Sequence, residues 1–284
     1  MKISVFSNYK NEDVISLSRQ IVQKLSEFCE KVYVDDEHKS LFDDTVCAAD
    51  KSELMALCDL AVCVGGDGTT LAVAKEASFQ NKTVLGINAG RLGFMSGLEK
   101  NELEMLGKLA SGEYSIDERM MLTASIYQEE ELISSYHCLN DAVITRGGLA
   151  RLIDISVMVE GRLATNTRAD GMIVSTPTGS TAYSMAAGGP VLSPDNSCFV
   201  VTPICPHSLL NRSIVFSSDK ELTLFVENDV YKNSFLALDG QESIPIEHNS
   251  KIVISKSEYT AKLIKIKPDN FYEILNKKII ERRY

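Results

Sequence analysis

Residues 61–71, Ala-Val-Cys-Val-Gly-Gly-Asp-Gly-Thr-Thr-Leu, constrain the fold more than any other stretch of the sequence. Its four small apolar residues predict a buried strand, its three glycines within four positions predict a tight turn, and the chain from Thr69 onward is compatible with a helix. Such a turn attracts phosphate, because the first amides of a helix have no partner and glycine lets a ligand approach the backbone.

Asp67 is the exception in this loop, because a carboxylate among phosphate-binding amides repels an anion unless it has a chemical task. It can hold Mg²⁺ or take a proton from an attacking hydroxyl. The alternative is a plain strand-to-helix turn in which Asp67 caps the helix. Two other phosphate loops are excluded: Leu71 stands where the dinucleotide fingerprint requires its third glycine, and no Walker A sequence occurs.

Composition limits the partners and the compartment. A chain of 284 residues allows one large domain or two ordinary ones, and its net charge of −10 argues against a nucleic-acid binder. The seven cysteines are scattered without a Cys-x-x-Cys pair, which predicts reduced thiols. The opening apolar run, Ile3 to Phe6, is too short for a signal-peptide core, and no run approaches membrane-spanning length. We therefore expect a cytoplasmic protein without a nucleic-acid or membrane partner.

The periodicity of apolar residues divides the chain into two parts. Up to about residue 110, strands (2–7, 31–34, 61–64, 83–88) alternate with helical segments such as 13–28, which predicts an α/β fold with a doubly wound parallel sheet. From Met120, alternation over 122–127, 152–159, 222–226 and 251–255 predicts a β-rich, mostly antiparallel domain.

Helical periodicity returns at the end of the chain, where Asp269 can cap a helix over 268–283. We therefore expect an α/β domain over 1–115, a β-rich domain over 116–267, and a C-terminal helix, 268–284, that packs back on the first domain.

Three segments of the second half carry polar groups suited to chemistry. Asn140-Asp141 can accept hydrogen bonds from vicinal hydroxyls such as those of a ribose, or can be a simple polar turn. Residues 175–183, which follow Arg168-Ala169-Asp170-Gly171 and a short strand, combine proline, glycine and hydroxyl donors, and predict either a second phosphate loop or a capped helix start. His207 is a candidate general base or a structural residue.

No histidines stand at the spacing of a zinc site, and no serine nucleophile elbow occurs. Two loops of glycine and hydroxyl residues, one with a carboxylate, favour phosphoryl transfer to a hydroxyl, which needs mainly positioning, charge neutralisation and a base.

Together these motifs resemble, in order, those of the NAD kinases. The matching segments are 65–69 (Gly-Gly-Asp-Gly-Thr), 86–94, 140–141, 170–171, 176–183 and 202–212. The likeness extends from the first strand to residues 238–241. The first motif is shared with lipid kinases and, more loosely, with phosphofructokinases, whereas segment 176–183 beside it is more specific.

The resemblance implies an enzyme that phosphorylates the 2′-hydroxyl of the adenosine ribose of NAD, giving NADP. ATP or polyphosphate would be the donor, with a divalent metal, Mg²⁺, and no dedicated metal ligand in the protein. The family typically forms dimers or tetramers through its β-rich domains, so we expect a homodimer or homotetramer.

Roles carry over by position. Asp67 would be the catalytic residue that orients or deprotonates the 2′-hydroxyl. Backbone amides at Gly66 and Gly68 would meet phosphates, with Thr69 beside them. Asn140 and Asp141 would hold the ribose hydroxyls; Asp141 stands where the family often has glutamate, which shortens the reach by one methylene. The adenine pocket would be lined by Thr181, Ala182 and Tyr183, and the NAD cleft between the domains completed by Phe94, Arg168, Asp170, Thr178 and Ala186.

Two rival functions remain on the sequence alone. A lipid or sugar kinase can use the same glycine loop, although Thr181-Ala182-Tyr183 argues for an adenine pocket. A catalytically silent NAD(P) sensor can keep the cleft, although it has no need of Asp67.

Overall fold

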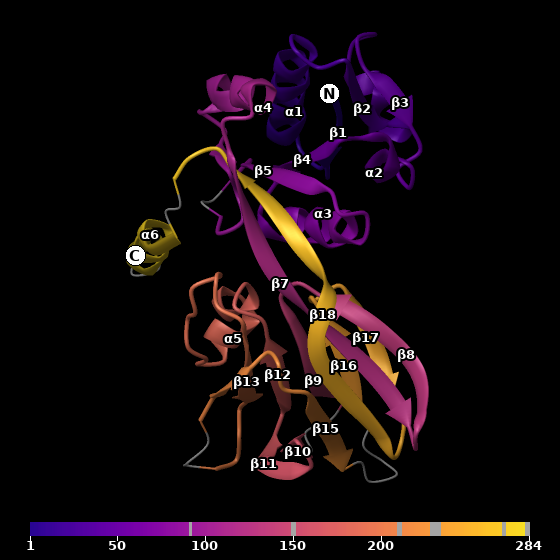
Figure 1. The fold of residues 1–284 in the computed structure, drawn as a ribbon, viewed down its shortest axis with the longest axis vertical. Helices are drawn as coiled ribbons and strands as arrows, with labels where there is room; N and C mark the ends of the chain where they lie inside the picture. The colour runs from indigo at the N-terminus through magenta and orange to yellow at the C-terminus, as the bar shows by residue number, and fades with distance from the viewer. Residues whose placement is uncertain (91–92, 149–151, 209–211, 228–233, 269–270, 282–284) are drawn as a thin grey trace. The chain divides into compact units, whose positions relative to one another are not determined.

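The computed structural model describes residues 1–90, 93–148, 152–208, 212–227, 234–268 and 271–281 (Figure 1). The chain forms two compact units, Met1–Glu118 with Ala261–Tyr284, and Arg119–Thr260. The first unit is therefore built from both ends of the chain, and the second lies between them in sequence.

A parallel sheet forms the centre of the first unit. Its strands follow the order β5-β4-β1-β2-β3, and the end of β18 pairs in parallel with β5 through Lys262 and Leu263, as β6 does through Leu98 and Glu99. The strands are β1 (Lys2–Ser7), β2 (Lys31–Asp35), β3 (Cys47–Ala49), β4 (Leu60–Gly65), β5 (Thr83–Asn88), β6 (Leu98–Glu99) and the far end of β18 (Ser250–Lys265). Every residue of β4 is buried, as expected of a central strand in a parallel sheet.

Helices accompany this sheet. They are α1 (Glu12–Ser26), η1 (Asp36–Leu41), α2 (Leu54–Leu57), α3 (Asp67–Phe79), η2 (Leu103–Gly107), α4 (Lys108–Ser111) and α6 (Phe271–Glu281). Helix α1 begins where the Asn11 side chain accepts the Val14 N–H at 2.9 Å, and it buries Leu17, Ile21 and Leu25 on the sheet. Phe28, expected within this helix, lies beyond its end and is partly buried against the same core.

The second unit is an antiparallel sandwich. One sheet has the order β14-β13-β12-β9-β16-β17, and the other pairs β11-β10-β15-β18, with β7 on β18 and β8. Its elements are β7 (Ser115–Gln128), β8 (Glu131–Cys138), β9 (Asp141–Arg146), β10 (Ile153–Val159), β11 (Arg162–Ala169), β12 (Gly171–Ser175), η3 (Gly179–Thr181), α5 (Tyr183–Ala186), β13 (Cys198–Ile204), β14 (Ile214–Ser217), β15 (Leu222–Glu227), β16 (Ser234–Leu238) and β17 (Glu242–Ile246). Alternate residues of both sheets, among them Ile155, Val174, Phe199 and Leu224, form one core.

The predicted fold class, a parallel α/β domain followed by an antiparallel β-rich domain, is confirmed. The units divide at 118/119 and 260/261, inside the long strands β7 and β18. The first division lies close to the change of periodicity at Met120, whereas the second falls within β18, which continues through it. Helix α6 belongs to the first unit, and the expected cap Asp269 lies outside the described residues. Within the described ranges, no helix is long and apolar enough to cross a membrane.

Candidate active site

The glycine turn after β4 leaves the N-terminus of α3 open. Gly66 is the N-cap, and its carbonyl accepts the N–H groups of Thr69 and Thr70, both at 3.1 Å, while no side chain caps the helix. A Cβ on Gly66 or Gly68 would meet nothing within 4 Å, so the fold itself does not require glycine at either position. The open space beside these amides can admit a ligand, and the dipole of α3 favours an anion there.

Asp67 does not cap α3, so that alternative is wrong. It is the first helical residue, and its carboxylate accepts backbone N–H groups from a distant segment: Oδ2 from Phe94 and Oδ1 from Met95, both at 3.1 Å. A Cβ on Gly93 would lie 2.4 Å from Asp67 Oδ1, so glycine is required there for this close approach. The carboxylate therefore ties the glycine turn to residues 93–95.

The C-terminal helix also reaches Asp67. Lys278 Nζ lies 3.3 Å from Asp67 Oδ2 and 4.1 Å from the centroid of the Phe94 ring, and the Phe271 ring lies 5.8 Å from that of Phe94. A carboxylate accepts about four hydrogen bonds, and three donors occupy this one. Asp67 keeps its remaining acceptor capacity on a side chain that is 36% exposed. It can therefore accept a proton or a hydrogen bond from a ligand hydroxyl.

More oxygen ligands lie at the end of β5. Asn88 Oδ1 accepts the Gly90 N–H at 3.0 Å, and Asn88 Nδ2 donates to Glu99 Oε2 at 2.8 Å. Burial raises the pKa of Glu99, and the charges of Glu102 and Asp67 add to the shift. Asp67 and Glu99 are thus close enough to influence one another, and their carboxylates are of the type that binds Mg²⁺.

In the second unit, Asp239 holds the turn that contains Asn140 and Asp141. Its carboxylate accepts three successive backbone N–H groups, from Leu139 at 3.1 Å, Asn140 at 2.7 Å and Asp141 at 3.1 Å. The backbone of Asp239 is left-handed, with φ of 51°, and its own N–H donates to the carbonyl of Asp141 at 3.0 Å. The turn is therefore fixed by a residue that follows β16, 98–100 positions away in sequence.

Asp141 is buried beside this second carboxylate. It is 5% exposed, and among the described residues no hydrogen bond reaches its side chain. Burial, followed by the charge of Asp239, raises the pKa of Asp141 to about 7. At neutral pH the group is thus divided between a carboxylic acid that can donate and a carboxylate that can only accept.

A cavity of about 450 Å³, here called the carboxylate pocket, brings several of the predicted residues together. It is lined by Asn140, Asp141, Thr145, Ala182, Tyr183 and Asp239 among others. Its volume is in the range of small-molecule sites. An uncharged hydroxylated group fits its acceptors better than a phosphate, because two carboxylates would repel an anion.

In the expected second phosphate loop, residues 175–183, three hydroxyls donate to backbone carbonyls and are therefore not available as donors to a ligand. Thr176 Oγ1 donates to the Leu139 carbonyl at 2.6 Å, Ser180 Oγ to that of Pro177 at 2.6 Å, and Ser175 Oγ to that of Thr176 at 2.8 Å. A Cβ on Gly179 would lie 2.2 Å from the Asn140 carbonyl oxygen. Through the bond from Thr176 and this close approach, the loop braces the 139–141 turn. Phosphate binding by this loop remains a prediction.

The other predicted residues lie outside the set that lines the carboxylate pocket. Thr178 is buried and accepts Arg119 Nη1 at 3.3 Å. Asp170 pairs with Arg146, at 2.5 Å, and Arg168 is 61% exposed, 3.9 Å from Asp154. The Thr181 hydroxyl donates a hydrogen bond to the Thr178 carbonyl, and Ala186 is exposed on α5. His207 is exposed and lines neither described cavity.

Sequence reasoning missed three residues of these sites: Lys278, Asp239 and Arg119. Lys278 lies in the predicted C-terminal helix, but no local pattern there indicates a contact with Asp67. Asp239 lies in a segment that carries the family likeness, but no local pattern indicates that it accepts three backbone amides. Arg119, 3% exposed, stands in an ordinary strand sequence.

An open glycine turn with one carboxylate, on a parallel sheet, and a carboxylate-lined pocket in an antiparallel sandwich define a class of protein that handles phosphorylated, hydroxyl-bearing ligands. Two family models match the chain, the ATP-NAD kinase N-terminal domain over residues 3–114 and the ATP-NAD kinase C-terminal domain over residues 139–266. The chain therefore belongs to the ATP-NAD kinase family.

Individual relatives agree with this family. The NAD kinase of Desulforamulus reducens is 37% identical over 280 residues, which cover 98% of this chain and 97% of that protein. The NAD kinase of Carboxydothermus hydrogenoformans is 42% identical over 224 residues, 78% of this chain and 80% of that protein.

Solved structures share the fold. An NAD kinase from Archaeoglobus fulgidus in complex with ATP matches with a TM-score of 0.73 and 25% identity, covering 98% of both chains. Yeast NADH kinase complexed with NADH matches with a TM-score of 0.85 over 97% of this chain and 86% of that one; at 23% identity this likeness speaks for the fold alone.

Proposed function

We propose that the protein is an NAD kinase that transfers the terminal phosphate of ATP to the 2′-hydroxyl of the adenosine ribose of NAD, giving NADP. Membership of the ATP-NAD kinase family and relatives named NAD kinase support the reaction. The observation that carries it is Asp67, a carboxylate at the first residue of α3 that keeps acceptor capacity beside open phosphate-binding amides.

Asp67 acts as the base in this proposal. The 2′-hydroxyl donates a hydrogen bond to the Asp67 carboxylate and loses its proton to it as the hydroxyl oxygen forms a bond to the terminal phosphorus of ATP. The bond from that phosphorus to the bridging oxygen breaks, and ADP leaves. The amides at Gly66 and Gly68, with Thr69, face the phosphates, where the dipole of α3 offsets their charge.

The second unit holds the acceptor nucleoside. Asn140 and Asp141 bind the ribose hydroxyls, and Ala182 and Tyr183 line the pocket beside them. For the remaining positions we propose the NAD-binding roles that the family resemblance implies. These positions are Phe94, Arg168, Asp170, Thr178, Thr181 and Ala186. Asp239 and Arg119 act as positioning residues, because they bond to the Asn140-Asp141 backbone and to Thr178.

A divalent metal, Mg²⁺, accompanies the phosphate donor. The carboxylate of Glu99 and the amide oxygen of Asn88 would be suitable oxygen ligands at the end of β5 in the first unit. When bound, the metal would offset charge on the transferring phosphate. Polyphosphate is an alternative donor. A cytoplasmic homodimer or homotetramer is the proposed state of the protein.

The test is purified protein with ATP, Mg²⁺ and NAD, with NADP detected by an NADP-specific dehydrogenase. NADH, a diacylglycerol and a sugar phosphate serve as parallel acceptors. Formation of NADP supports the proposal. Binding of NAD without turnover would support the silent sensor, and transfer to the lipid or sugar would mean that the acceptor pocket is assigned wrongly.

A further inference from the structure

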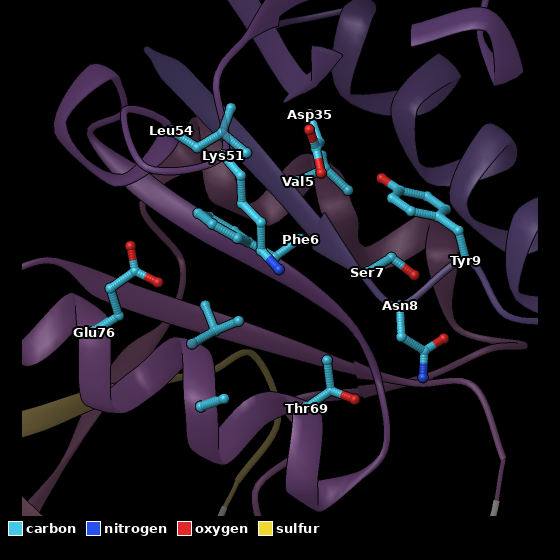
Figure 2. A pocket seen from close by; sticks show the side chains of 12 residues that line it. Val5, Phe6, Ser7, Asn8, Tyr9, Asp35, Lys51, Leu54, Thr69 and Glu76 are labelled. Carbon is cyan, nitrogen blue, oxygen red and sulfur yellow. The ribbon is translucent and has the colours of Figure 1, made fainter. Parts of the chain in front are cut away.

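A second cavity lies in the first unit, at the ends of β1 and β2 (Figure 2). It encloses about 250 Å³ and is lined among others by Phe6, Asn8, Asp35, Thr69, Ala72 and Glu76. We call it the strand-end pocket. None of the site residues expected from the sequence lines it except Thr69.

The sheet topology places this pocket where a parallel sheet offers a binding crevice. From β1 the chain passes through α1 to β2 on one side, and from β4 it passes through α3 to β5 on the other. Neighbouring strands β1 and β4 thus mark the point where the connections diverge. In open α/β sheets, ligands bind outside the carboxyl ends of the strands at such a point. Ser7 and Asn8, at the carboxyl end of β1, line the pocket.

The pocket continues from the glycine turn. Thr69 lies in the first turn of α3, two residues after Asp67, and Ala72 and Glu76 follow one and two turns later along the same helix. Figure 2 shows Thr69 and Glu76 on one side of the cavity, with Asp35 and Tyr9 on the other. A ligand with phosphates at the open N-terminus of α3 can therefore extend along this helix into the pocket.

The charges of the pocket exclude phosphate from its interior. Asp35 and Glu76 contribute two carboxylates against the single ammonium of Lys51, and Phe6 and Val73 supply apolar walls. Such a lining suits an uncharged ring that donates N–H groups to carboxylates, as an aminopurine does. A bare phosphate chain gains nothing from it.

Two buried hydroxyls in the pocket have no hydrogen-bond partner within the described part of the chain. They are Ser7 Oγ and Tyr9 OH, and the whole Tyr9 residue is only 8% exposed. A buried unsatisfied hydroxyl costs free energy that a bound polar ligand can recover. The Tyr9 ring is held by stacking on His38 at 4.5 Å between centroids, so its hydroxyl is fixed in place.

From these observations we propose that the strand-end pocket binds the nucleoside of the phosphate donor, an aminopurine with its ribose, while the phosphates of the donor lie at the glycine turn. The inference rests on the proposed function and adds the donor's base-binding site to it.

The experiment fills the pocket from its exposed side. Ala72 is exposed on α3, so Ala72→Leu adds bulk without entering the core and keeps a strong helix former at this position. Gln80→Leu, exposed at the other end of α3, is the matched control. We expect Ala72→Leu to raise the KM for ATP about tenfold or more, a loss of roughly 1.4 kcal/mol, with the KM for NAD and the kcat at saturating ATP unchanged.

Inorganic tripolyphosphate separates the pocket from the glycine turn, because it has phosphates but no nucleoside. Its inhibition constant against ATP should be the same in wild type, Ala72→Leu and Gln80→Leu. Glu76→Gln is a second variant for the case that Ala72→Leu lowers the thermal midpoint. It should likewise raise the KM for ATP and leave the KM for NAD and the tripolyphosphate inhibition constant unchanged. An unchanged KM for ATP in the folded variant, a rise in the KM for NAD, or an equal weakening of tripolyphosphate would overturn the proposal.

Failure of the proposed function gives a different result. If wild type forms no NADP, calorimetric titration with ADP still measures the affinity of the pocket for a purine nucleotide. Weaker ADP binding to Ala72→Leu than to Gln80→Leu would then uphold the pocket, and equal binding would overturn it.

Discussion

Asp67 combines a structural task with its proposed chemical one. Its two oxygens accept the N–H groups of Phe94 and Met95, and the Lys278 ammonium lies 3.3 Å away. Hydrogen bonds to an ionised acceptor are stronger than neutral ones, so the carboxylate is well held. A variant at this position therefore tests catalysis only if the 93–95 segment stays in place.

Asp67→Asn should lower kcat roughly 10²- to 10⁴-fold, the usual contribution of acid–base help, and leave NAD binding nearly unchanged. The amide nitrogen would face a backbone N–H on one side, so thermal melting and NAD titration must accompany the rate measurement. Asp195→Asn, an exposed carboxylate, is the control. A wild-type rate in Asp67→Asn would show that Asp67 is not the base.

Asp141 should make stability depend on pH. Its pKa is raised from 3.8 to about 7 in the folded chain, so between these values the folded state binds a proton that the unfolded state has released. The free energy of unfolding therefore falls as pH rises from about 4 to 7, by up to a few kcal/mol at 1.36 kcal/mol per pKa unit, and levels off above that range.

Asp141→Asn removes the titrating carboxyl group and with it this pH dependence of the free energy of unfolding. Urea unfolding at pH 5 and pH 8 should show the variant gaining stability relative to wild type at pH 8. Equal pH dependence in the two proteins would contradict the raised pKa.

At the scale of elements, α6 acts as a clamp on the glycine-turn side of the first unit. Phe271 and Ile274 are 7% and 4% exposed and dock the helix, and Lys278 then reaches both Asp67 and the Phe94 ring. The ion pair is partly exposed and contributes little to stability by itself. Burial of the apolar residues therefore holds α6 in place.

Phe271→Ala should release this helix, because truncating a buried phenylalanine costs about 3–5 kcal/mol. Hydrogen exchange should speed up in α6 and in residues 93–95 while β1 and β4 remain protected. Tyr272→Ala is the matched control, because its neighbouring ring is 67% exposed. Equal exchange in the two variants would mean that α6 is not held by Phe271.

Local sequence patterns predicted elements well and their long-range partners poorly. The strand, glycine turn and helix around Asp67 follow from eleven consecutive residues, and α1 from its apolar spacing and Asn11. Contacts of Asp67 with Lys278, 211 positions away, and of Asp239 with Asn140, 99 positions away, depend on tertiary packing that no local period encodes. The hydroxyls of 175–180 show the same limit, because composition does not tell whether a hydroxyl points to a ligand or to a carbonyl.

For the whole molecule, the metal of the proposed reaction should be separable from the fold. Among the described residues, the two cores consist of aliphatic, methionine and phenylalanine side chains with a single buried cysteine, Cys138. EDTA should therefore abolish NADP formation and leave the thermal midpoint unchanged, with activity restored by added Mg²⁺; a structural metal would lower the midpoint on removal. Calorimetry before and after chelation measures the midpoint, and a marked fall would contradict the assignment of the metal to the donor.

The second unit is an insertion in the first, and this fixes the order in which the chain can mature on a ribosome. Residues 1–118 emerge early, but β18 and α6, which complete their unit, are synthesised only after residues 119–260. Because domains fold as they emerge, the sandwich can close while the parallel sheet still lacks its strand beside β5. Lys278, which contacts Asp67, is translated after residues 119–260, so nascent chains stalled before residue 261 would carry the glycine turn without the lysine that pairs with Asp67.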